Sequence, residues 1–463
     1  MTDLDVRAFG ARGDASVDDT PAFHAAFAAI TANGGGRVRV PPGRYRVAGL
    51  KPVSNLRLEL DPGAVLEGPT RIEDYPAVTG WLGDICPYHV INAQDCEHLT
   101  IAGGVIRGHG AAFWRQPEHP GGWLRHDNPR RPSPMVDLRG CTDLRLEGVH
   151  FDAPAGWTLH IYECTGVLVD ACVITTDPAG PNTDGIDISG SSDVVVRGCR
   201  ISCGDDAIVV FPSERRDASG IVVDGCILES LCVALKAYNW CDYPGSVRDL
   251  VFARCVVRRT NRVLACYAHE AGVLERITMT DVLADTDCPL VSGRPIHLDA
   301  RPFRKPIGTP VGGIHHVRVR GLHCRTDGRI LMTAAGSQVR DVDLADITLE
   351  YPRIADPGIV PNRPDYGSAQ DSNLSPEARR FPAALVADGI EDLRVRDLRL
   401  RFDRDAARPW YHGPRRGNGY HDIFPPAVPP ARFHPYWIRG AADLCPITAA
   451  QVGPAGETGL RTA

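Results

Sequence analysis

The sequence lacks the features that mark several large classes of protein. It has no run of 18 apolar residues, and its start, MTDLDVRAFGARGD, has neither a basic nor an apolar leader region. Its 15 cysteines are too few for a disulfide scaffold and form no paired CxxC motif of the zinc-ribbon kind. We therefore expect a soluble, cytoplasmic protein with buried free thiols, no membrane association and no metal or other cofactor, although a chain trimmed of its signal peptide would start in the same way.

Basic charge is also scarce. The formal net charge is -6 at pH 7, and no run of Lys or Arg occurs. This balance argues against a general nucleic-acid binder. An anionic polymer stays open as a partner, because a local basic groove can coexist with an acidic total.

Glycine and proline are abundant, with 47 and 38 residues, and they fit many short strands separated by turns. A unit recurs along the chain, in which an alternating apolar strand leads through a small or polar corner to a cysteine and a second apolar strand. Its best copies are residues 165–174, 192–201, 219–228 and 248–257. They place Cys172, Cys199, Cys226 and Cys255 at spacings of 27, 27 and 29 residues.

A coil of this length is too short to bury its own apolar side. Stacking coils at about 4.8 Å pairs each strand with those above and below, and buries alternate residues inside. Equal positions then form ladders, so the four cysteines are predicted to form one inward ladder. The predicted fold is all-β, a single-stranded right-handed parallel β-helix.

The ends of the chain depart from this repeat. Residues 20–31 are predicted to form an amphipathic helix that caps the open end of the coils, with Asp18, Asp19 and Thr20 as capping candidates before Pro21. We expect residues 1–404 to form the β-helix, with an irregular excursion near 352–388, and residues 405–463 to be a tail packed on its outside.

The segment 181–210, PNTDGIDISGSSDVVVRGCRISCGDDAIVV, carries the candidate chemistry. Asp184 and Asp205 are 21 residues apart, close to one coil, and Asp206 can share their patch if Gly204 makes a corner. Three close carboxylates repel, which favours a proton remaining on one of them near neutral pH. Glycosidic cleavage uses such a pair of states, an acid for the leaving oxygen and carboxylates that activate water.

A structural interpretation of the same residues is also available. Asp and Asn are common in turns, so NTDG and GDD can be turn sequences without chemistry. Asp187 in particular suits a turn or support role better than catalysis.

NTDGIDI followed by CGDDAI resembles the signature of glycoside hydrolase family 28, the polygalacturonases and their relatives, and residues 157–174 resemble the stretch that leads into it. Residues 5–30 and 34–47 are similar to the opening of pectate-lyase-like β-helix proteins. The resemblance covers roughly the first 280 residues. It implies Asp205 as general acid, Asp184 and Asp206 as activators of water, and inversion at the anomeric carbon.

Several positions depart from that family. Leu231 stands where the family has the His of Gly-His-Gly, and Leu264 and Cys266 fall on its Arg-Ile-Lys cations. Phe211 replaces a Lys that commonly follows the GDD strand. Without these donors a uronate carboxylate would be poorly paired, so we expect a substrate other than galacturonan.

Other side chains are candidates for binding sugar. Lys236 can replace a lost cation, and aromatic rings can stack on sugar C–H faces. Each also has an ordinary interpretation as a solvated charge or a packing aromatic. The predicted substrate-binding residues are Lys236, Tyr238, Trp240, Arg262, Tyr267, His269, Glu270 and His109, and Trp114 lies in the same loop as His109.

Three functions remain open from the sequence. The first is an inverting glycoside hydrolase, of exo type, on an oligosaccharide or glycoside. The second is a polysaccharide lyase or epimerase, in which Lys236 would be the base and the aspartates would hold a metal. The third is a β-helix that binds carbohydrate without cleaving it, although the presence of all three aspartates argues against this.

Overall fold

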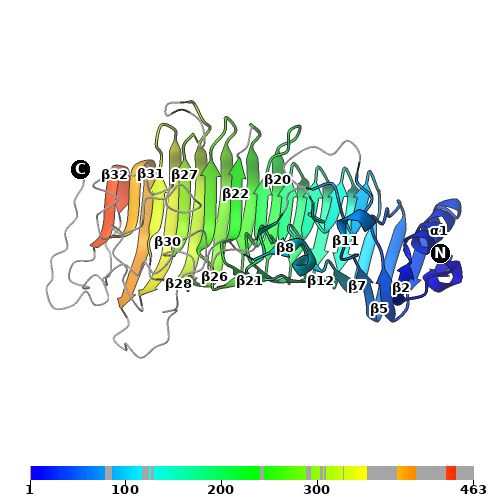
Figure 1. The fold of residues 1–463 in the computed structure, drawn as a ribbon. Helices are drawn as coiled ribbons and strands as arrows, with labels where there is room; N and C mark the ends of the chain where they lie inside the picture. The colour runs from blue at the N-terminus through cyan, green and yellow to red at the C-terminus, as the bar shows by residue number, and fades with distance from the viewer. Residues whose placement is uncertain are drawn as a thin grey trace. The chain divides into compact units, whose positions relative to one another are not determined.

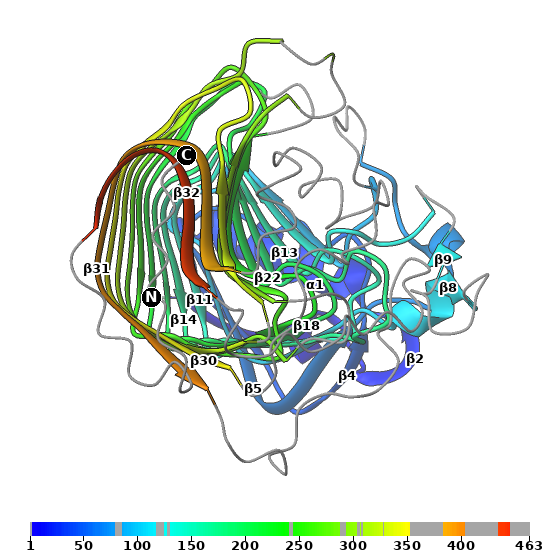
Figure 2. The ribbon, with the colours of Figure 1, turned by 90° about the vertical axis from the view of Figure 1, so that its left-hand side faces the viewer.

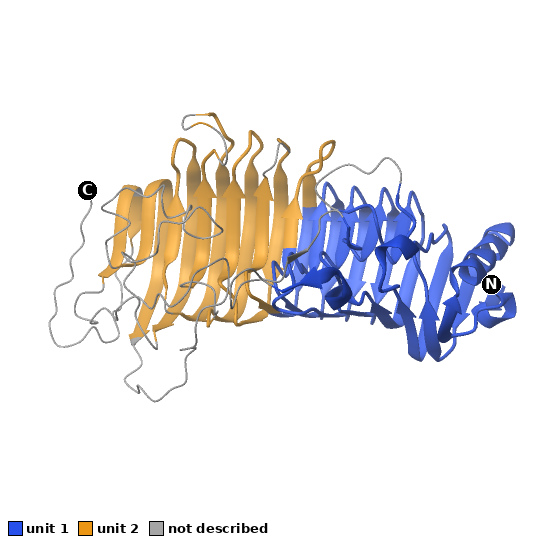
Figure 3. Ribbon diagram, viewed as in Figure 1, with its two compact units in different colours: residues 1–208, 220–228 blue, residues 209–219, 229–463 orange. Residues whose placement is uncertain are grey.

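The computed structural model describes residues 2–78, 86–116, 125–126, 130–239, 244–287, 293–302, 306, 309–326, 328–351, 383–402 and 434–444. Strands and turns dominate, so the fold is all-β as predicted. The chain divides into two compact units (Figure 3). Unit 1 comprises residues 1–208 and 220–228, and unit 2 comprises residues 209–219 and 229–463.

Unit 1 begins with strands that pair in parallel, β1 (Thr2–Asp5) with β3 (Gly36–Val40) and then β5 (Leu56–Glu67), and β2 (Asp14–Asp18) with β4 (Gly43–Arg46). Later coils add strands to three faces, seen as parallel arrows in Figure 1 and along the coils in Figure 2. The first face has β6 (Ile91–Gln94), β10 (Val136–Arg139), β13 (Leu159–Tyr162), β16 (Ile186–Ser189) and β19 (Ile208–Phe211). The second has β7 (Thr100–Arg107), β11 (Thr142–Glu147), β14 (Thr165–Asp170), β17 (Ser192–Arg197) and β20 (Ala218–Asp224). The third has β12 (His150–Asp152), β15 (Val173–Thr175), β18 (Arg200–Cys203) and β21 (Ile227–Ser230). Residues 209–211 of β19, 218–219 of β20 and 229–230 of β21 are counted in unit 2.

Constant register puts like residues above one another in unit 1. Leu146 of β11 pairs with Val169 of β14, which pairs with Val196 of β17, and all three side chains are buried. Alternate apolar residues of each strand therefore fill the inside of the coils, as the repeat predicted.

The predicted cysteine ladder is confirmed within unit 1. Backbone hydrogen bonds between neighbouring coils place Cys172, Cys199 and Cys226 at equal positions, and all three side chains are buried. Cys255 is buried in unit 2. A small apolar side chain thus fits the tight corner of each coil.

A second cysteine column was not apparent from the repeat. Cys96, Cys141 and Cys164 occupy another corner of unit 1, where the Cys96 N–H donates to Cys141 Sγ at 3.4 Å. Hydrogen bonding with Cys141, together with burial, raises the pKa of the Cys164 thiol. The Cys164 thiol is therefore a protonated core residue.

The predicted helix is α1 (Thr20–Ala32), with Pro21 in its first turn. It buries Phe23 and Phe27, and the Phe23 ring meets the edge of Tyr45 in β4 at 5.8 Å. Of the three capping candidates, Asp19 is the N-cap residue, but its side chain makes no capping hydrogen bond. Its carboxylate accepts from the N–H groups of residues 12 and 13. Asp18 accepts from the Thr20 N–H at 3.0 Å and supplies the local contact.

Unit 1 also contains short elements at its edges. These are the 3₁₀ turns η1 (Val6–Phe9), η2 (Ile72–Asp74) and η3 (Gly110–Phe113), and the antiparallel pair β8 (Trp114–Arg115) and β9 (Arg125–His126).

Unit 2 repeats the parallel arrangement. One face has β22 (Val233–Asn239), β25 (Arg262–Ala268), β27 (Arg294–Ala300), β29 (Ile330–Thr333), β31 (Ala383–Phe402) and β32 (His434–Leu444). The others have β23 (Val247–Ala253), β24 (Val256–Arg258), β26 (Leu274–Asp285), β28 (Ile314–Arg325) and β30 (Val339–Tyr351). On the first face the in-register residues Leu235, Leu264 and Ile296 are buried in the core.

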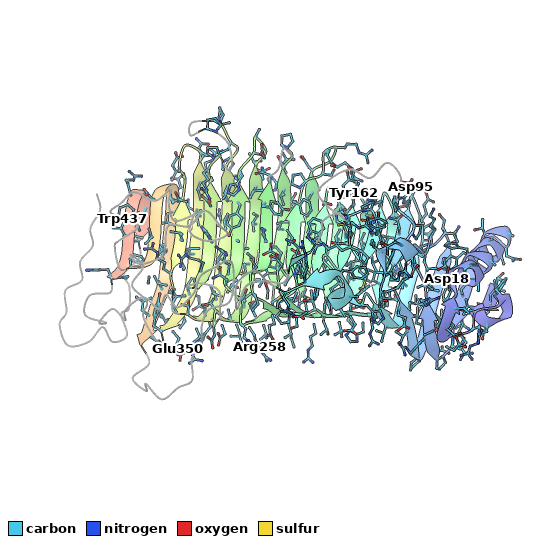
Figure 4. The ribbon with its side chains drawn as sticks, viewed as in Figure 1. Asp18, Asp95, Tyr162, Arg258, Glu350 and Trp437 are labelled. Carbon is cyan, nitrogen blue, oxygen red and sulfur yellow. The ribbon has the colours of Figure 1, made fainter. Side chains whose placement is uncertain are left out.

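Most of the predicted excursion, residues 352–382, lies outside the described residues, and β31 begins directly after it. Within the predicted tail, β32 pairs in parallel with β31, and its Trp437 (labelled in Figure 4) packs in a buried cluster with Leu331 and Val386. No helix in the described ranges is long and apolar enough to span a membrane.

Candidate active site

The three predicted catalytic aspartates lie at the starts of neighbouring strands of unit 1. Asp184 is two residues before β16, and Asp205 and Asp206 come just before β19. The Gly185 N–H donates to the Asp206 carbonyl at 2.9 Å, so the two acidic segments occupy adjacent rungs, as their spacing predicted. The three side chains are only 6%, 4% and 4% exposed. Three buried aspartates therefore lie on two adjacent rungs of unit 1.

Gly204 makes the predicted bend before Asp205. A Cβ atom at this position would lie 2.6 Å from Thr183 Oγ1 and 2.8 Å from the Pro178 carbonyl. Its N–H donates to Thr176 Oγ1 at 3.1 Å. Close packing, and not a left-handed backbone, is the reason for glycine here.

Gly185 is the point of closest approach between the two acidic segments. A Cβ atom there would lie 2.4 Å from the Ala207 carbonyl oxygen, which cannot move without moving its coil. We expect Gly185→Ala to lower the free energy of unfolding by about 1–3 kcal/mol, as overpacking does, and urea unfolding measures this. Gly148→Ala is the comparison, since its added Cβ meets nothing and only its φ of +61° disfavours alanine, so its loss should be the smaller. An equal loss in that variant would contradict the role of the contact.

Arg131 is a site residue that the sequence did not reveal. Its guanidinium donates to the carbonyls of Ala155 and Pro181 at 3.0 and 2.7 Å and to Asn182 Oδ1 at 3.2 Å. Burial lowers the pKa of Arg131, while negative charge on neighbouring groups, Asp184 and Asp205 among them, opposes that shift. Arg131 therefore holds the segment that leads into Asp184 and brings a positive charge to the aspartates. It lies 53 residues before Asp184 and 74 before Asp205, in a sequence without a motif, so no pattern pointed to it.

Removing this charge has a testable consequence for pH dependence. A nearby cation favours ionised carboxyl groups, so its loss makes protons leave them at higher pH. We expect Arg131→Met to shift the acidic limb of the pH–activity profile to higher pH. Arg130→Met is the matched control, because that exposed neighbour pairs with Glu73 at 2.7 Å. Profiles that coincide for wild type and Arg131→Met would contradict the assignment.

Trp114 and His109, both flagged from the sequence, have different positions. The Trp114 Nε1–H donates at 2.9 Å to the Ala155 carbonyl, which also accepts from Arg131. A Cβ at Gly180 would lie 2.6 Å from the Trp114 ring, so this ring packs on the loop before Asp184. His109 lies 3.6 Å from Glu67 of β5. Its contact with substrate stays a prediction.

A buried polar chain runs along the first face of unit 1. Asp137 and His160 are in register on β10 and β13 and bond at 2.8 Å, and His160 Nε2 lies 2.7 Å from Ser189 Oγ. Asp187 is in register with His160, which agrees with the support role that the sequence suggested for it. Arg139 donates to Asp137 at 2.7 Å and lies over the ring of Tyr162, a side chain labelled in Figure 4.

Unit 2 gathers most of the predicted sugar-binding residues that the structure describes. Tyr238 and Tyr267 are in register on β22 and β25, and Lys236 Nζ lies 4.6 and 6.0 Å from their ring centres. The Tyr267 ring stacks on His269 at 5.6 Å with an interplanar angle of 4°. Lys236 and Tyr238 are partly exposed, so they can meet a ligand.

The other predicted members are more deeply buried. Arg262 Nε donates to His297 Nδ1 at 3.2 Å, and the backbone N–H groups of His269 and Glu270 donate to Asn239 Oδ1 at 2.8 and 3.1 Å. Arg262, His269 and Glu270 are 4%, 1% and 6% exposed. Trp240 lies outside the described residues.

The prediction that Leu264 and Cys266 occupy the positions of the family's two cations needs a correction. Leu264 and Cys266 point into the coil interior, because they lie in the core rows of β25, so a cation there would be buried among apolar residues. The outward positions of β25 are Ala265 and Tyr267, which pack with Val233 in a separate cluster. Neither is a cation.

The two other positions that differ from the family, Leu231 and Phe211, carry buried apolar side chains. Leu231 is 6% exposed. Phe211 is 5% exposed and stacks on Tyr238 with ring centres 5.0 Å apart.

Comparison with known proteins agrees with this geometry. The model of glycosyl hydrolases family 28 matches residues 66–225. A probable polygalacturonase of Arabidopsis thaliana is 35% identical over 215 residues, which is 45% of this chain and 42% of that protein. A second one from the same plant is 25% identical over 361 residues, 75% of this chain and 77% of the relative.

Among solved structures, a hyperthermoactive exopolygalacturonase from Thermotoga maritima matches with a TM-score of 0.58 and 21% identity, over 76% of this chain and 87% of that one. This likeness supports the parallel β-helix-like fold. The family match over residues 66–225 and the two plant relatives support placing the chain as a divergent relative of glycosyl hydrolases family 28.

Proposed function

We propose that the protein is an inverting glycoside hydrolase that uses the aspartates of unit 1. The observation that carries the proposal is the meeting of the NTDG and GDD segments on adjacent rungs, with all three carboxyl groups buried. In this mechanism Asp205 protonates the leaving glycosidic oxygen, and Asp184 and Asp206 activate a water molecule on the opposite face of the sugar. Arg131 brings a positive charge to Asp184 and Asp205, which favours their ionised forms.

We further propose that the substrate is an oligosaccharide other than galacturonan, although the relatives are named as polygalacturonases. The support is chemical. Ala265 and Tyr267 face outward on β25, and Phe211 and Leu231 are apolar, so these positions offer a uronate carboxylate no cation. We also propose that the enzyme is cytoplasmic and attacks the ends of imported oligosaccharide fragments. The proposed fold has right-handed coils, with α1 capping their open end.

The test is a screen of neutral and acidic oligosaccharides with the full chain, read by reducing ends and mass spectrometry. The expected result is cleavage of at least one non-galacturonan substrate, with NMR showing that the first product has the inverted anomeric configuration. An unsaturated product, or loss of activity on adding a chelator, would replace hydrolysis by a lyase. Cleavage of polygalacturonate alone would overturn the substrate proposal but leave the hydrolase.

A further inference from the structure

Strand β27 of unit 2 carries two polar residues that no motif marked. His297 and Asp299 are in register with the outward residues Ala265 and Tyr267 of β25, so they share the outward face of this sheet. Both side chains are completely buried. Buried polar side chains are usually fully hydrogen-bonded, which makes their partners informative.

The hydrogen bonds of His297 fix its tautomer. Arg262 Nε can only donate, so His297 Nδ1 must accept at 3.2 Å, and Tyr267 Oη lies 3.3 Å from the same nitrogen. Burial, followed by the positive charges of Arg262, Arg294 and Arg301, holds the pKa of His297 well below its usual value. The ring is therefore neutral, and its proton is on Nε2.

That Nε2–H is a buried donor without an acceptor among the residues that the structure describes. Asp299 presents the complementary case. Its Oδ2 accepts from Arg301 Nε at 2.8 Å and lies 3.4 Å from His269 Nε2, while its Oδ1 has no hydrogen-bond partner within the described part of the chain. An unmet donor and an unmet acceptor thus stand two residues apart on one face of one strand. Leaving each unpaired is unfavourable, so a ligand that supplies both would be stabilised.

Sugar hydroxyls have this dual character, because each O–H both donates and accepts. The neighbouring side chains suit a sugar ring as well. Tyr267 meets the edge of His297 at 5.2 Å, and the partly exposed Lys236 and Tyr238 border Tyr267 on the side open to solvent. Partly exposed side chains therefore lie next to a ring that contacts the buried pair.

We propose that His297 and Asp299 form a saccharide subsite in unit 2, in which His297 Nε2–H donates to one ring hydroxyl and Asp299 Oδ1 accepts from another. The inference rests on the proposed function for its ligand class, a carbohydrate. It adds two specificity-determining residues on β27.

The test measures binding without turnover. Ligand-observed NMR titrations of the full chain carrying Asp205→Asn would use the methyl glycosides of galactose, rhamnose and galacturonic acid, together with their monodeoxy analogues. We expect at least one parent glycoside to bind about tenfold more tightly than one of its deoxy forms. The ratio of the two dissociation constants should fall to near one after His297→Phe and recover in His297→Gln, whose amide restores a donor.

His316→Phe is the matched control, because His316 pairs with Asp341 at 2.6 Å elsewhere in unit 2. It should leave the ratio unchanged. A ratio that survives His297→Phe, or no binding of any glycoside, overturns the subsite. If His297→Phe does not fold, Asp299→Asn replaces it, because its amide oxygen keeps the bond from Arg301 and its NH2 group takes the place of the accepting Oδ1. A ratio near one in that variant supports the subsite, and an unchanged ratio overturns it. Since hydrolysis is not read, failure here is distinguishable from failure of the catalytic proposal.

Discussion

Asp205→Asn is expected to lower kcat by about 10²- to 10⁴-fold on any glycoside that the wild type cleaves. An amide of the same shape cannot deliver a proton to the leaving oxygen, and general acid catalysis contributes about this much. The backbone geometry should be retained, because Gly204 makes the contacts that build the bend before Asp205, a hydrogen bond to Thr176 and close packing on Thr183. Initial rates over a range of substrate concentrations give kcat directly.

Two comparisons make this prediction specific. Asp193→Asn makes the same chemical change at an exposed position of β17 and should leave the rate unaltered. A nitrophenyl glycoside of the same sugar needs little proton assistance, so the Asp205 variant should lose much less activity on it. Equal losses on both substrates would show that Asp205 is not the proton donor.

Asp137→Ala is expected to cause the largest loss of stability in unit 1, about 3–5 kcal/mol. The change removes one partner from a buried set and leaves His160 and Arg139 without their shared carboxylate. Although burial by itself raises it, hydrogen bonding from His160 and the charges of His89 and Arg139 hold the pKa of Asp137 below its usual value. Its carboxylate therefore stabilises the fold above about pH 4, the range of an unfolded aspartate, and this contribution is lost as pH falls through the lower folded value.

Urea unfolding at pH 7 and at pH 3 measures the effect, and hydrogen exchange of peptides covering residues 136–162 localises it. The gap between wild type and Asp137→Ala should narrow at the lower pH. Asp170→Ala is the control, since Asp170 pairs with Arg197 at the surface, and its effect should be much smaller. A gap that widens on acidification would contradict the pKa argument.

The periodic parts of this protein could be predicted from sequence because each coil repeats the same physical problem. Each strand pairs with the strands above and below it and buries one face, so its sequence alternates between apolar and polar residues. Each corner is too tight for a large side chain, so cysteine recurs at 172, 199 and 226. The aspartates were found for the same reason, because a spacing near one coil brings Asp184 and Asp205 onto adjacent rungs. The strand alternation and the spacing of the aspartates can both be recognised within one or two coils of the repeat.

The remainder depends on non-periodic contacts. Arg131 reaches Ala155 and Pro181 from a segment without alternation, and nothing in its neighbourhood of prolines indicates where it folds back. His297 and Asp299 lie on an ordinary strand pattern, and only the hydrogen-bond inventory distinguishes them from support residues. The outward residue of β25 is Ala265 and not Leu264. Successive side chains of a strand point to opposite faces, so an error of one position in the alignment reverses which residues point outward.

The buried thiols can report local opening of the coils. Twelve cysteines in the described ranges are unbridged and buried, and they are spread over the coils of both units. A thiol-modifying reagent can attack them only when a coil opens, so labelling rates resolved by peptide mass spectrometry would report the free energy of opening coil by coil. The cysteines of the coils thus serve as natural reporters of local opening, and no additional cysteines need to be introduced.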